Sequence, residues 1–397
     1  MTENRGTWCF WPATATIAGP SGGLPSGVAL RQCAGNLPRK FEPQAHRTMK
    51  QAVIVGVQGV IGRYICDHLL KLGDWEVIGL SRRQPAETRP RLRHVSVDLL
   101  DRADAEAKLS GLTGVTHIFY CAFQSRPTWA EHNAPNLAML VNAVEPIAKA
   151  SKVLEHINLI QGTKYYGSHL GPFKTPAKES DPPHMLPNFY YDQEQWLRTN
   201  QPASRWTWSA LRPHAICGFA LGNPMNLMTC LAVYAAISKE LGLPLRFPGK
   251  PGTFDAIYQM TDSALLAKGM TWAATTPAAY NQVFNLTNGD FFRWRNVWPR
   301  IARAFDMEPG PVQTIKLTEF MTDKAPLWSA MQQKYGLEAH PYEQLVAWPF
   351  ADYVWAGDWD IMSDMTKIRR AGFHEYVDSE DIILGMLAEF RRQRIIP

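Results

Sequence analysis

The sequence has no uninterrupted apolar run of about 18 residues, the length that a helix needs to cross a bilayer. It therefore predicts no membrane span and no membrane partner. The six cysteines include no CxxC pair and no cluster with histidines at metal-ligand spacing. This predicts free thiols, no metal site and a reducing, cytoplasmic compartment. The cysteines are Cys9, Cys33, Cys66, Cys121, Cys217 and Cys230.

A strong charge imbalance is also missing. Lysine and arginine number 41 against 36 aspartates and glutamates, which gives a net charge of +5. Residues 1–48 hold five of the basic residues and only two of the acidic ones, so more than half of the excess lies there. The rest of the chain is close to neutral, which excludes a broad basic surface and predicts no nucleic-acid partner.

Residues 1–48 differ from the rest because they are rich in Pro, Gly, Ser and Thr and keep no helical or strand period. A secretory signal within residues 8–18 is one alternative, but Pro12 interrupts that stretch and few positive charges precede it. Met49 stands directly before the first predicted strand. The pattern favours a disordered tail, or a non-native upstream extension.

From residue 49 onward, apolar runs of strand length alternate with segments at helical spacing. This alternation predicts an α/β fold with a doubly wound parallel Rossmann sheet. We expect one domain over residues 49–397. Its cofactor-binding core covers about residues 50–215, and a smaller C-terminal lobe, mostly residues 216–397, binds substrate. The predicted strands are 52–57, 75–80, 95–97, 117–123, 156–161 and 206–211, and the clearest predicted helices are 61–72 and 136–151.

A G-x-x-G-x-x-G motif lies between the first predicted strand and the helix that follows it. Gly56 permits a tight turn, Gly59 lets the backbone approach a pyrophosphate, and Gly62 allows the helix to pack closely on the strand. The free N–H groups of the helix N-terminus face the anion. Ordinary turn glycines are the alternative, but the place in a βαβ unit favours a dinucleotide site. The predicted cofactor-binding residues here are Gly56, Gln58, Gly59, Val60, Ile61 and Gly62.

The end of the second predicted strand favours NADPH over NADH. An NAD site usually has an acidic residue there, whereas this chain has Ser81, Arg82 and Arg83. A guanidinium can bind the 2′-phosphate of NADPH in a bidentate pair. Asp98, after the third strand, is placed to accept a hydrogen bond from the adenine amino group. The alternatives are two solvated arginines and an ordinary turn aspartate.

The catalytic residues do not follow the commonest pattern. None of the 13 tyrosines has a lysine four positions later, so the YxxxK pair of most short-chain reductases is missing. Instead, QGTKYYG at 161–167 follows the fifth strand and NFYYDQE at 188–194 opens a later helix. These two segments resemble the progesterone 5β-reductase/iridoid synthase family, an atypical branch of the short-chain reductases. The resemblance covers roughly residues 50–397 and includes FNLTNGD at 284–290.

By this resemblance, Lys164 is the active-site lysine and Tyr190 the catalytic tyrosine, and both belong to the cofactor site. Tyr190 holds the enolate oxygen after hydride transfer to an activated double bond, and the cationic Lys164 favours a polarised phenol. The segment RPHAICG at 212–218 packs beside the nicotinamide, which adds Ile216 to the cofactor site. The predicted substrate residues are Phe123, His214 and Phe350, with a loop role for His214 and a core role for Phe350 as alternatives.

The leading hypothesis is therefore an NADPH-dependent enone reductase, which reduces the C=C bond of a small apolar α,β-unsaturated carbonyl compound. The first alternative is a carbonyl reductase or epimerase, against which the missing YxxxK argues. The second is a non-catalytic NADP(H)-sensing regulator, which would not need the Tyr190 and Lys164 pair. Because dimers are common for this fold, a homodimer is also expected.

Overall fold

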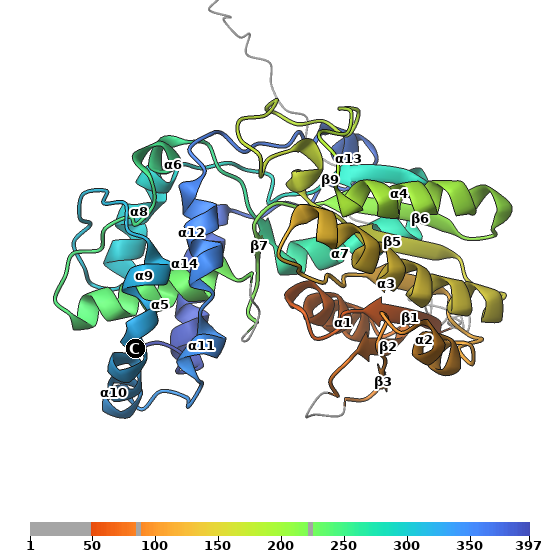
Figure 1. Ribbon diagram of the computed structural model, residues 1–397, viewed down its shortest axis with the longest axis horizontal. Coiled ribbons are helices and arrows are strands. Elements are labelled where there is room, and N and C mark those ends of the chain that lie inside the picture. The colour runs from red at the N-terminus through yellow and green to blue at the C-terminus, as the bar shows by residue number, and fades with distance from the viewer. Residues whose placement is uncertain (1–48, 85–88, 221–224) are drawn as a thin grey trace, which may run out of the picture. The chain divides into compact units, whose positions relative to one another are not determined.

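The computed structural model describes residues 49–84, 89–220 and 225–397, so the predictions for residues 1–48 lie outside the described residues. Seven parallel strands form one sheet in the order β3-β2-β1-β4-β5-β6-β9 (Figure 1). The order reverses between β1 and β4, and open α/β sheets bind ligands at the carboxyl ends of such strands. The strands are β1 (Lys50–Val55), β2 (Trp75–Ser81), β3 (Leu92–Ser96), β4 (His117–Tyr120), β5 (His156–Ile160), β6 (Thr207–Arg212) and β9 (Gln282–Asn285).

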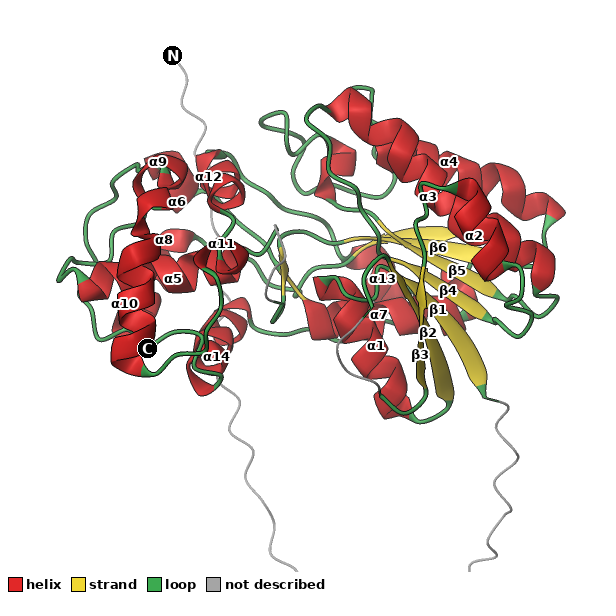
Figure 2. Cartoon of the chain, turned by 60° about the horizontal axis from the view of Figure 1, so that its bottom comes forward, coloured by secondary structure: helices red, strands yellow, loops and turns green. Residues whose placement is uncertain are grey.

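Helices cover both faces of this sheet, because successive strand residues point to opposite sides. Val53 and Val55 of β1 pack into one buried cluster, whereas Ala52 and Ile54 pack into another on the opposite face. Figure 2 shows the sheet between these two layers. The first face is covered by α2 (Arg102–Leu109), α3 (Trp129–Ala150) and α4 (Phe189–Asn200), and the second by α1 (Val60–Leu72), α7 (Ser263–Thr275) and α13 (Thr366–Arg370).

A second, helical lobe has its own buried cluster, in which tryptophans pack edge to face. Helix α5 runs through it and is buried from Leu227 to Ser238. A two-stranded sheet, β7 (Ile216–Cys217) with β8 (Thr261–Asp262), lies where the chain enters and leaves this lobe (Figure 1). The helices of the lobe are α5 (Leu227–Glu240), α6 (Pro251–Asp255), α8 (Trp294–Ala304), α9 (Leu317–Phe320), α10 (Ala325–Tyr335), α11 (Tyr342–Leu345), α12 (Trp348–Ala356) and α14 (Ser379–Arg392). Four 3-10 helices, η1 (Thr163–Tyr166), η2 (Gln201–Ala203), η3 (Pro277–Ala279) and η4 (Thr322–Lys324), complete the described elements.

The doubly wound parallel sheet predicted from the sequence is confirmed, and all six predicted strands are present within a few residues of the expected bounds. The fourth strand ends at Tyr120 rather than at residue 123, because the chain then leaves the sheet. Helix α3 begins at Trp129, earlier than expected, with Pro135 and Pro146 inside it. Strand β9 was not predicted. No helix in the described ranges is long and apolar enough to cross a membrane.

Candidate active site

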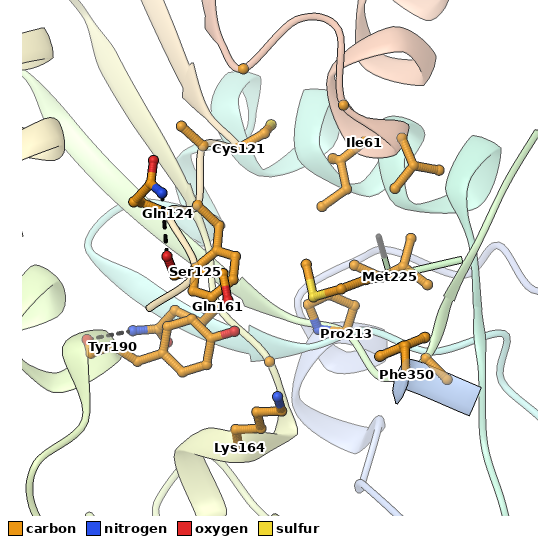
Figure 3. Close-up of a pocket in the computed structure, with 18 of the residues that line it drawn as sticks. Ile61, Cys121, Gln124, Ser125, Gln161, Lys164, Tyr190, Pro213, Met225 and Phe350 are labelled. Atoms are coloured by element: carbon orange, nitrogen blue, oxygen red, sulfur yellow. Dashed lines mark hydrogen bonds between the residues drawn. The ribbon is translucent and has the colours of Figure 1, made fainter. Parts of the chain in front are cut away.

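A cavity of about 940 Å3 opens at the carboxyl ends of the strands. Its wall includes Gly56 after β1, Cys121 after β4 and Gln161 after β5, and Phe350 of α12 faces them from the helical lobe (Figure 3). The predicted site residues on this wall are Gly56, Gly59, Val60, Ile61, Ser81, Arg82, Asp98, Phe123, Lys164, Tyr190, His214, Ile216 and Phe350. Three others, Gln58, Gly62 and Arg83, do not line it.

The glycine turn has the geometry that a close backbone approach requires. Gly56 has φ +86°, and a Cβ on it would lie 3.2 Å from the backbone of Ala122. A Cβ on Gly62 would lie 2.1 Å from the Gly56 carbonyl oxygen, so helix α1 packs against the turn itself. The N-cap, Gly59, has no side chain to bond the first N–H groups of α1. These donors therefore remain available to an anion.

The turn after β2 is held by three side-chain hydrogen bonds to its backbone. Gln58 Nε2 and Ser81 Oγ both donate to the Arg83 carbonyl oxygen, each at 2.6 Å. Ser96 Oγ donates to the Arg82 carbonyl oxygen at 2.8 Å. Both arginine side chains are exposed, and neither is paired with a carboxylate among the described residues. Gln58 thus joins the glycine turn to the arginine turn, although it does not reach the cavity.

Asp98 and Ile216 both line the cavity. Asp98 Oδ1 accepts a hydrogen bond from the Leu100 N–H at 3.0 Å, which leaves its second carboxylate oxygen for a ligand. Ile216 is half-buried in β7, where it pairs with Thr261. Its side chain can therefore contribute an apolar surface to a ring bound beside it.

Tyr190 and Lys164 are brought together by one buried side chain, that of Asn188. Asn188 Oδ1 accepts from the Tyr190 N–H at 3.1 Å and thereby caps helix α4. Its Nδ2 donates to the Lys164 carbonyl oxygen at 2.9 Å. The tyrosine on α4 and the lysine on η1 are thus tied at the backbone, although they lie far apart in sequence. Figure 3 shows both side chains pointing into the cavity.

Lys164 carries its charge in an aromatic surrounding. Its Nζ lies 5.2 Å from the Trp129 ring centroid and 4.9 Å from that of Tyr353, both favourable cation–π distances. It forms no ion pair with a described carboxylate, and burial lowers its pKa to about 8. Burial also raises the pKa of Tyr190. No described residue forms a hydrogen bond with the Tyr190 hydroxyl or with Lys164 Nζ, so both groups are free to bind a ligand.

The predicted substrate residues differ in how they face the cavity. Phe123 is partly exposed and stacks on Phe189 with ring centroids 5.4 Å apart. His214 Nδ1 is hydrogen bonded to Thr163 Oγ1 at 2.7 Å, and its Nε2 is fully enclosed without a described partner. Phe350 lies at the start of α12. The two phenylalanines therefore offer apolar contacts, whereas His214 supports the wall through Thr163.

Comparison with known proteins places this architecture in a family. A family model described as a PRISE-like Rossmann-fold domain matches residues 83–397. The chain belongs to this PRISE-like family. This confirms the resemblance that the two sequence segments predicted. The chain is an oxidoreductase, and its relatives include a steroid 5β-reductase and a short chain dehydrogenase.

Two of these relatives cover almost the whole chain. The (S)-8-oxocitronellyl enol synthase of Nepeta racemosa is 37% identical over 90% of this chain and 96% of its own length. The 3-oxo-Δ(4,5)-steroid 5β-reductase of Arabidopsis thaliana is 33% identical over 87% of this chain and 93% of its own. Among solved structures, the UDP-glucose 4-epimerase of Thermotoga maritima matches with a TM-score of 0.63 over 86% of this chain and 99% of that one. At 15% identity that likeness shows the fold alone.

The PRISE-like site contains a buried polar network that the sequence analysis missed. The Arg212 guanidinium is 2.9 Å from the Glu194 carboxylate and also donates to Gln161 Oε1 at 2.9 Å. Gln161 Nε2 in turn donates to the Tyr190 carbonyl oxygen at 3.0 Å. Arg212 ends β6 and Gln161 follows β5, so this network fixes α4 against the carboxyl edge of the sheet. The only trace of it in the sequence is that Arg212 directly follows the predicted strand 206–211.

Three aromatic residues around the predicted pair were also missed. Trp129 and Tyr353 flank Lys164, and Tyr258 lines the cavity beside His214. A signal existed for Tyr353, which lies three residues after the predicted Phe350 and therefore on the same helix face. Trp129 and Tyr258 carry no such signal, because an isolated aromatic in the sequence resembles any core residue.

Proposed function

We propose that this enzyme reduces the C=C bond of α,β-unsaturated carbonyl compounds with NADPH. The observation that carries the proposal is the convergence of the Tyr190 hydroxyl and Lys164 Nζ on one cavity, both without a described hydrogen-bonding partner. The family supports it. One relative is named for a 3-oxo-Δ(4,5)-steroid, in which the carbonyl is conjugated to a C=C bond. Another is named for an oxocitronellyl enol, and an enol is what forms when hydride and then a proton on oxygen add to a conjugated carbonyl compound.

The residues present fit NADPH. The glycine turn at Gly56 and the uncapped N-terminus of α1 suit a pyrophosphate. The exposed Arg82 and Arg83 suit a 2′-phosphate, and Asp98 suits the adenine amino group. The bound dinucleotide supplies a hydride to the β-carbon of the substrate.

The chemistry of the protein itself concerns the substrate oxygen. As the double bond is reduced, negative charge moves onto the carbonyl oxygen, and the Tyr190 O–H donates a hydrogen bond to it. The cationic Lys164 favours a polarised phenol. The surrounding aromatic wall, which includes Phe123 and Phe350, excludes water and strengthens both interactions. The α-carbon then takes its proton from solvent when the product leaves.

The substrate proposed is a small apolar enone, since a cavity of about 940 Å3 must also hold the nicotinamide. The residues proposed to contact it are Phe123, His214 and Phe350. A reducing, cytoplasmic compartment is proposed as well, supported by the four described cysteines, which are all unpaired. A homodimer stays a prediction.

The deciding experiment follows NADPH oxidation by absorbance against a panel of cyclic and acyclic enones, with Tyr190→Phe beside the wild type. Enone-dependent oxidation should fall by about 10²- to 10⁴-fold in the variant while its NADPH affinity stays unchanged. Tyr191→Phe is the matched control. Its hydroxyl donates to the Tyr165 carbonyl oxygen at 2.6 Å, so this variant should lose stability rather than turnover.

Other outcomes identify the alternatives. Reduction of simple ketones with no enone activity favours the carbonyl reductase. Tight NADPH binding without turnover of enones or ketones favours the cofactor sensor.

A further inference from the structure

His94 on β3 forms a side-chain hydrogen bond with Ser81, the residue that ends β2 and lines the cavity. His94 Nε2 lies 2.7 Å from Ser81 Oγ, and the same Oγ lies 2.6 Å from the Arg83 carbonyl oxygen. A serine hydroxyl has one proton to donate, and a carbonyl oxygen can only accept. Ser81 therefore donates to Arg83, and the hydrogen bond between His94 and Ser81 is donated by Nε2–H.

The surroundings of the His94 ring agree with this tautomer. Its Nδ1 is enclosed and has no hydrogen-bonding partner among the described residues, so a proton on it would find no acceptor. Burial lowers the pKa of His94, which keeps the ring neutral at pH 7. Strand pairing sets its position, because His94 is opposite Gly79, two residues before Ser81. The ring is thus a neutral donor whose single N–H is directed at Ser81.

The hydrogen bonds around Ser81 converge on the turn that carries the two exposed arginines. The Arg83 carbonyl oxygen accepts from Ser81 Oγ and from Gln58 Nε2. The Arg82 carbonyl oxygen accepts from Ser96 Oγ. The backbone of the turn is therefore held in place, while both guanidinium groups remain exposed. The point from which each guanidinium reaches a phosphate is set by this backbone.

Ser81 acts on the turn rather than on an anion. Its one proton is donated to Arg83, so Ser81 Oγ has none left for a phosphate. Without the N–H of His94, the hydroxyl would be free to rotate, and Gln58 would be the remaining donor to the Arg83 carbonyl oxygen. A turn that has to be ordered on binding loses affinity for its ligand. The loss concerns the 2′-phosphate, because the pyrophosphate belongs to the glycine turn.

We propose that His94 is a positioning residue that determines cofactor preference, because it holds Ser81 and thereby orients the arginine turn that distinguishes NADPH from NADH. This rests on the proposed function, in which Arg82 and Arg83 bind the 2′-phosphate. His94 does not line the cavity, so it acts through Ser81 and not by contact with the cofactor.

The test measures the dissociation constants of NADP+ and NAD+ for the full-length protein by quenching of its fluorescence. His94→Leu removes the donor, whereas His94→Gln places an amide N–H near the position of Nε2. The affinity for NADP+ should fall about tenfold in His94→Leu, that for NAD+ should not change, and His94→Gln should recover most of the NADP+ affinity. Equal losses for both dinucleotides, or no loss, would overturn the proposal.

The matched control is His68→Leu, which replaces a half-buried histidine on α1. It should change neither affinity. A double-mutant cycle then tests whether His94 acts through Ser81. Ser81→Ala should lower NADP+ affinity as much as His94→Leu does, and the double variant should lose no more than either. Losses that multiply in the double variant contradict the proposal.

These outcomes are separate from enone reduction. If His94→Leu loses the preference for NADP+, the proposal stands even when no enone is reduced. If the preference survives in His94→Leu, the proposal fails even when every enone is reduced. A wild type that binds NADP+ and NAD+ equally refutes both the proposal and the assignment of NADPH, but not enone reduction with NADH.

Discussion

The side-chain amide of Asn188 donates to the carbonyl oxygen of Lys164 at 2.9 Å. The same side chain caps α4 through the Tyr190 N–H, so one residue sets the spacing of the proposed catalytic pair. In YxxxK enzymes the tyrosine and the lysine lie on one helix, and that helix sets the spacing between them. Here the lysine and tyrosine lie on different elements, and a buried asparagine replaces the helix.

Asn188→Ser tests this link. Serine remains a good N-cap but has no amide to donate to Lys164. We expect kcat to fall by about tenfold or more, because a shifted Lys164 polarises Tyr190 less, with only a small change in melting temperature. Asp378→Ser changes the cap of α14, remote from the cavity, and should leave kcat unchanged. Wild-type kcat in Asn188→Ser would show that the link is dispensable.

Lys164→Met should raise the melting temperature of the cofactor-free protein while it abolishes turnover. Burial lowers the pKa of Lys164 to about 8, below its ordinary value of 10.5. Between these values the unfolded chain binds the lysine proton more tightly than the folded chain does. The destabilisation is therefore greatest below about pH 8 and disappears as pH rises toward 10.5. Thermal melts of both proteins between pH 8 and 10.5 measure this destabilisation. If the melting temperature of Lys164→Met exceeds that of the wild type by the same amount at every pH, a buried lysine charge is not the cause.

The same pKa predicts a pH profile for the reaction. If the ammonium form of Lys164 assists Tyr190, kcat/KM for an enone falls as pH rises through about 8. Arginine at this position keeps its charge over the whole range. Any activity that Lys164→Arg retains should therefore not fall as pH rises through about 8. If kcat/KM of the variant still falls there, the fall belongs to another titrating group.

Arg82→Ala and Arg83→Ala should each weaken NADPH binding by about tenfold, the value of a charge-assisted hydrogen bond to phosphate. NADH affinity should not change, because NADH has no 2′-phosphate. Fluorescence titration with both dinucleotides gives the comparison. Arg93→Ala, an exposed arginine on β3, is the control. Equal losses of NADPH and NADH affinity would mean that these arginines do not bind the 2′-phosphate.

Gly62→Ala should destabilise the protein by about 1–3 kcal/mol and weaken dinucleotide binding. The new Cβ would lie 2.1 Å from the Gly56 carbonyl oxygen and 2.7 Å from the Val57 Cα, and neither backbone atom can move without disturbing the turn. Gly385→Ala on α14 is the opposite case, since nothing lies within 4 Å of its Cβ position. That variant should stabilise the fold by about 1 kcal/mol. Chemical denaturation distinguishes the two.

The sequence was sufficient for those parts of the molecule that depend on local pattern. Strand-length apolar runs, the glycine turn at Gly56 and the arginines after β2 all lie where their spacing indicated. The resemblance predicted Tyr190 and Lys164 as the catalytic pair, and both line one cavity, although their roles stay a prediction.

Features that depend on long-range contacts could not be predicted. Strand β9 is four residues long, and it becomes a strand by pairing with β6, which lies about 70 residues earlier. Asn188 opens the helix predicted from NFYYDQE, but its bond to Lys164 exists only in three dimensions. No local pattern distinguishes Tyr258 from a core aromatic, and it belongs to the buried cluster of the helical lobe.

The return of the chain to the sheet limits how this enzyme can acquire new substrates. After entering the helical lobe, the chain comes back as α7 and β9 and again as α13. A chimera that joined residues up to 215 to a foreign second half would lose α7, which packs against α1 and β5, and the strand that pairs with β6. The helical lobe therefore cannot be exchanged as one continuous segment without removing parts of the Rossmann domain. We therefore expect its substrate range to change by single substitutions on the cavity wall, while the sheet and the helical lobe keep their arrangement.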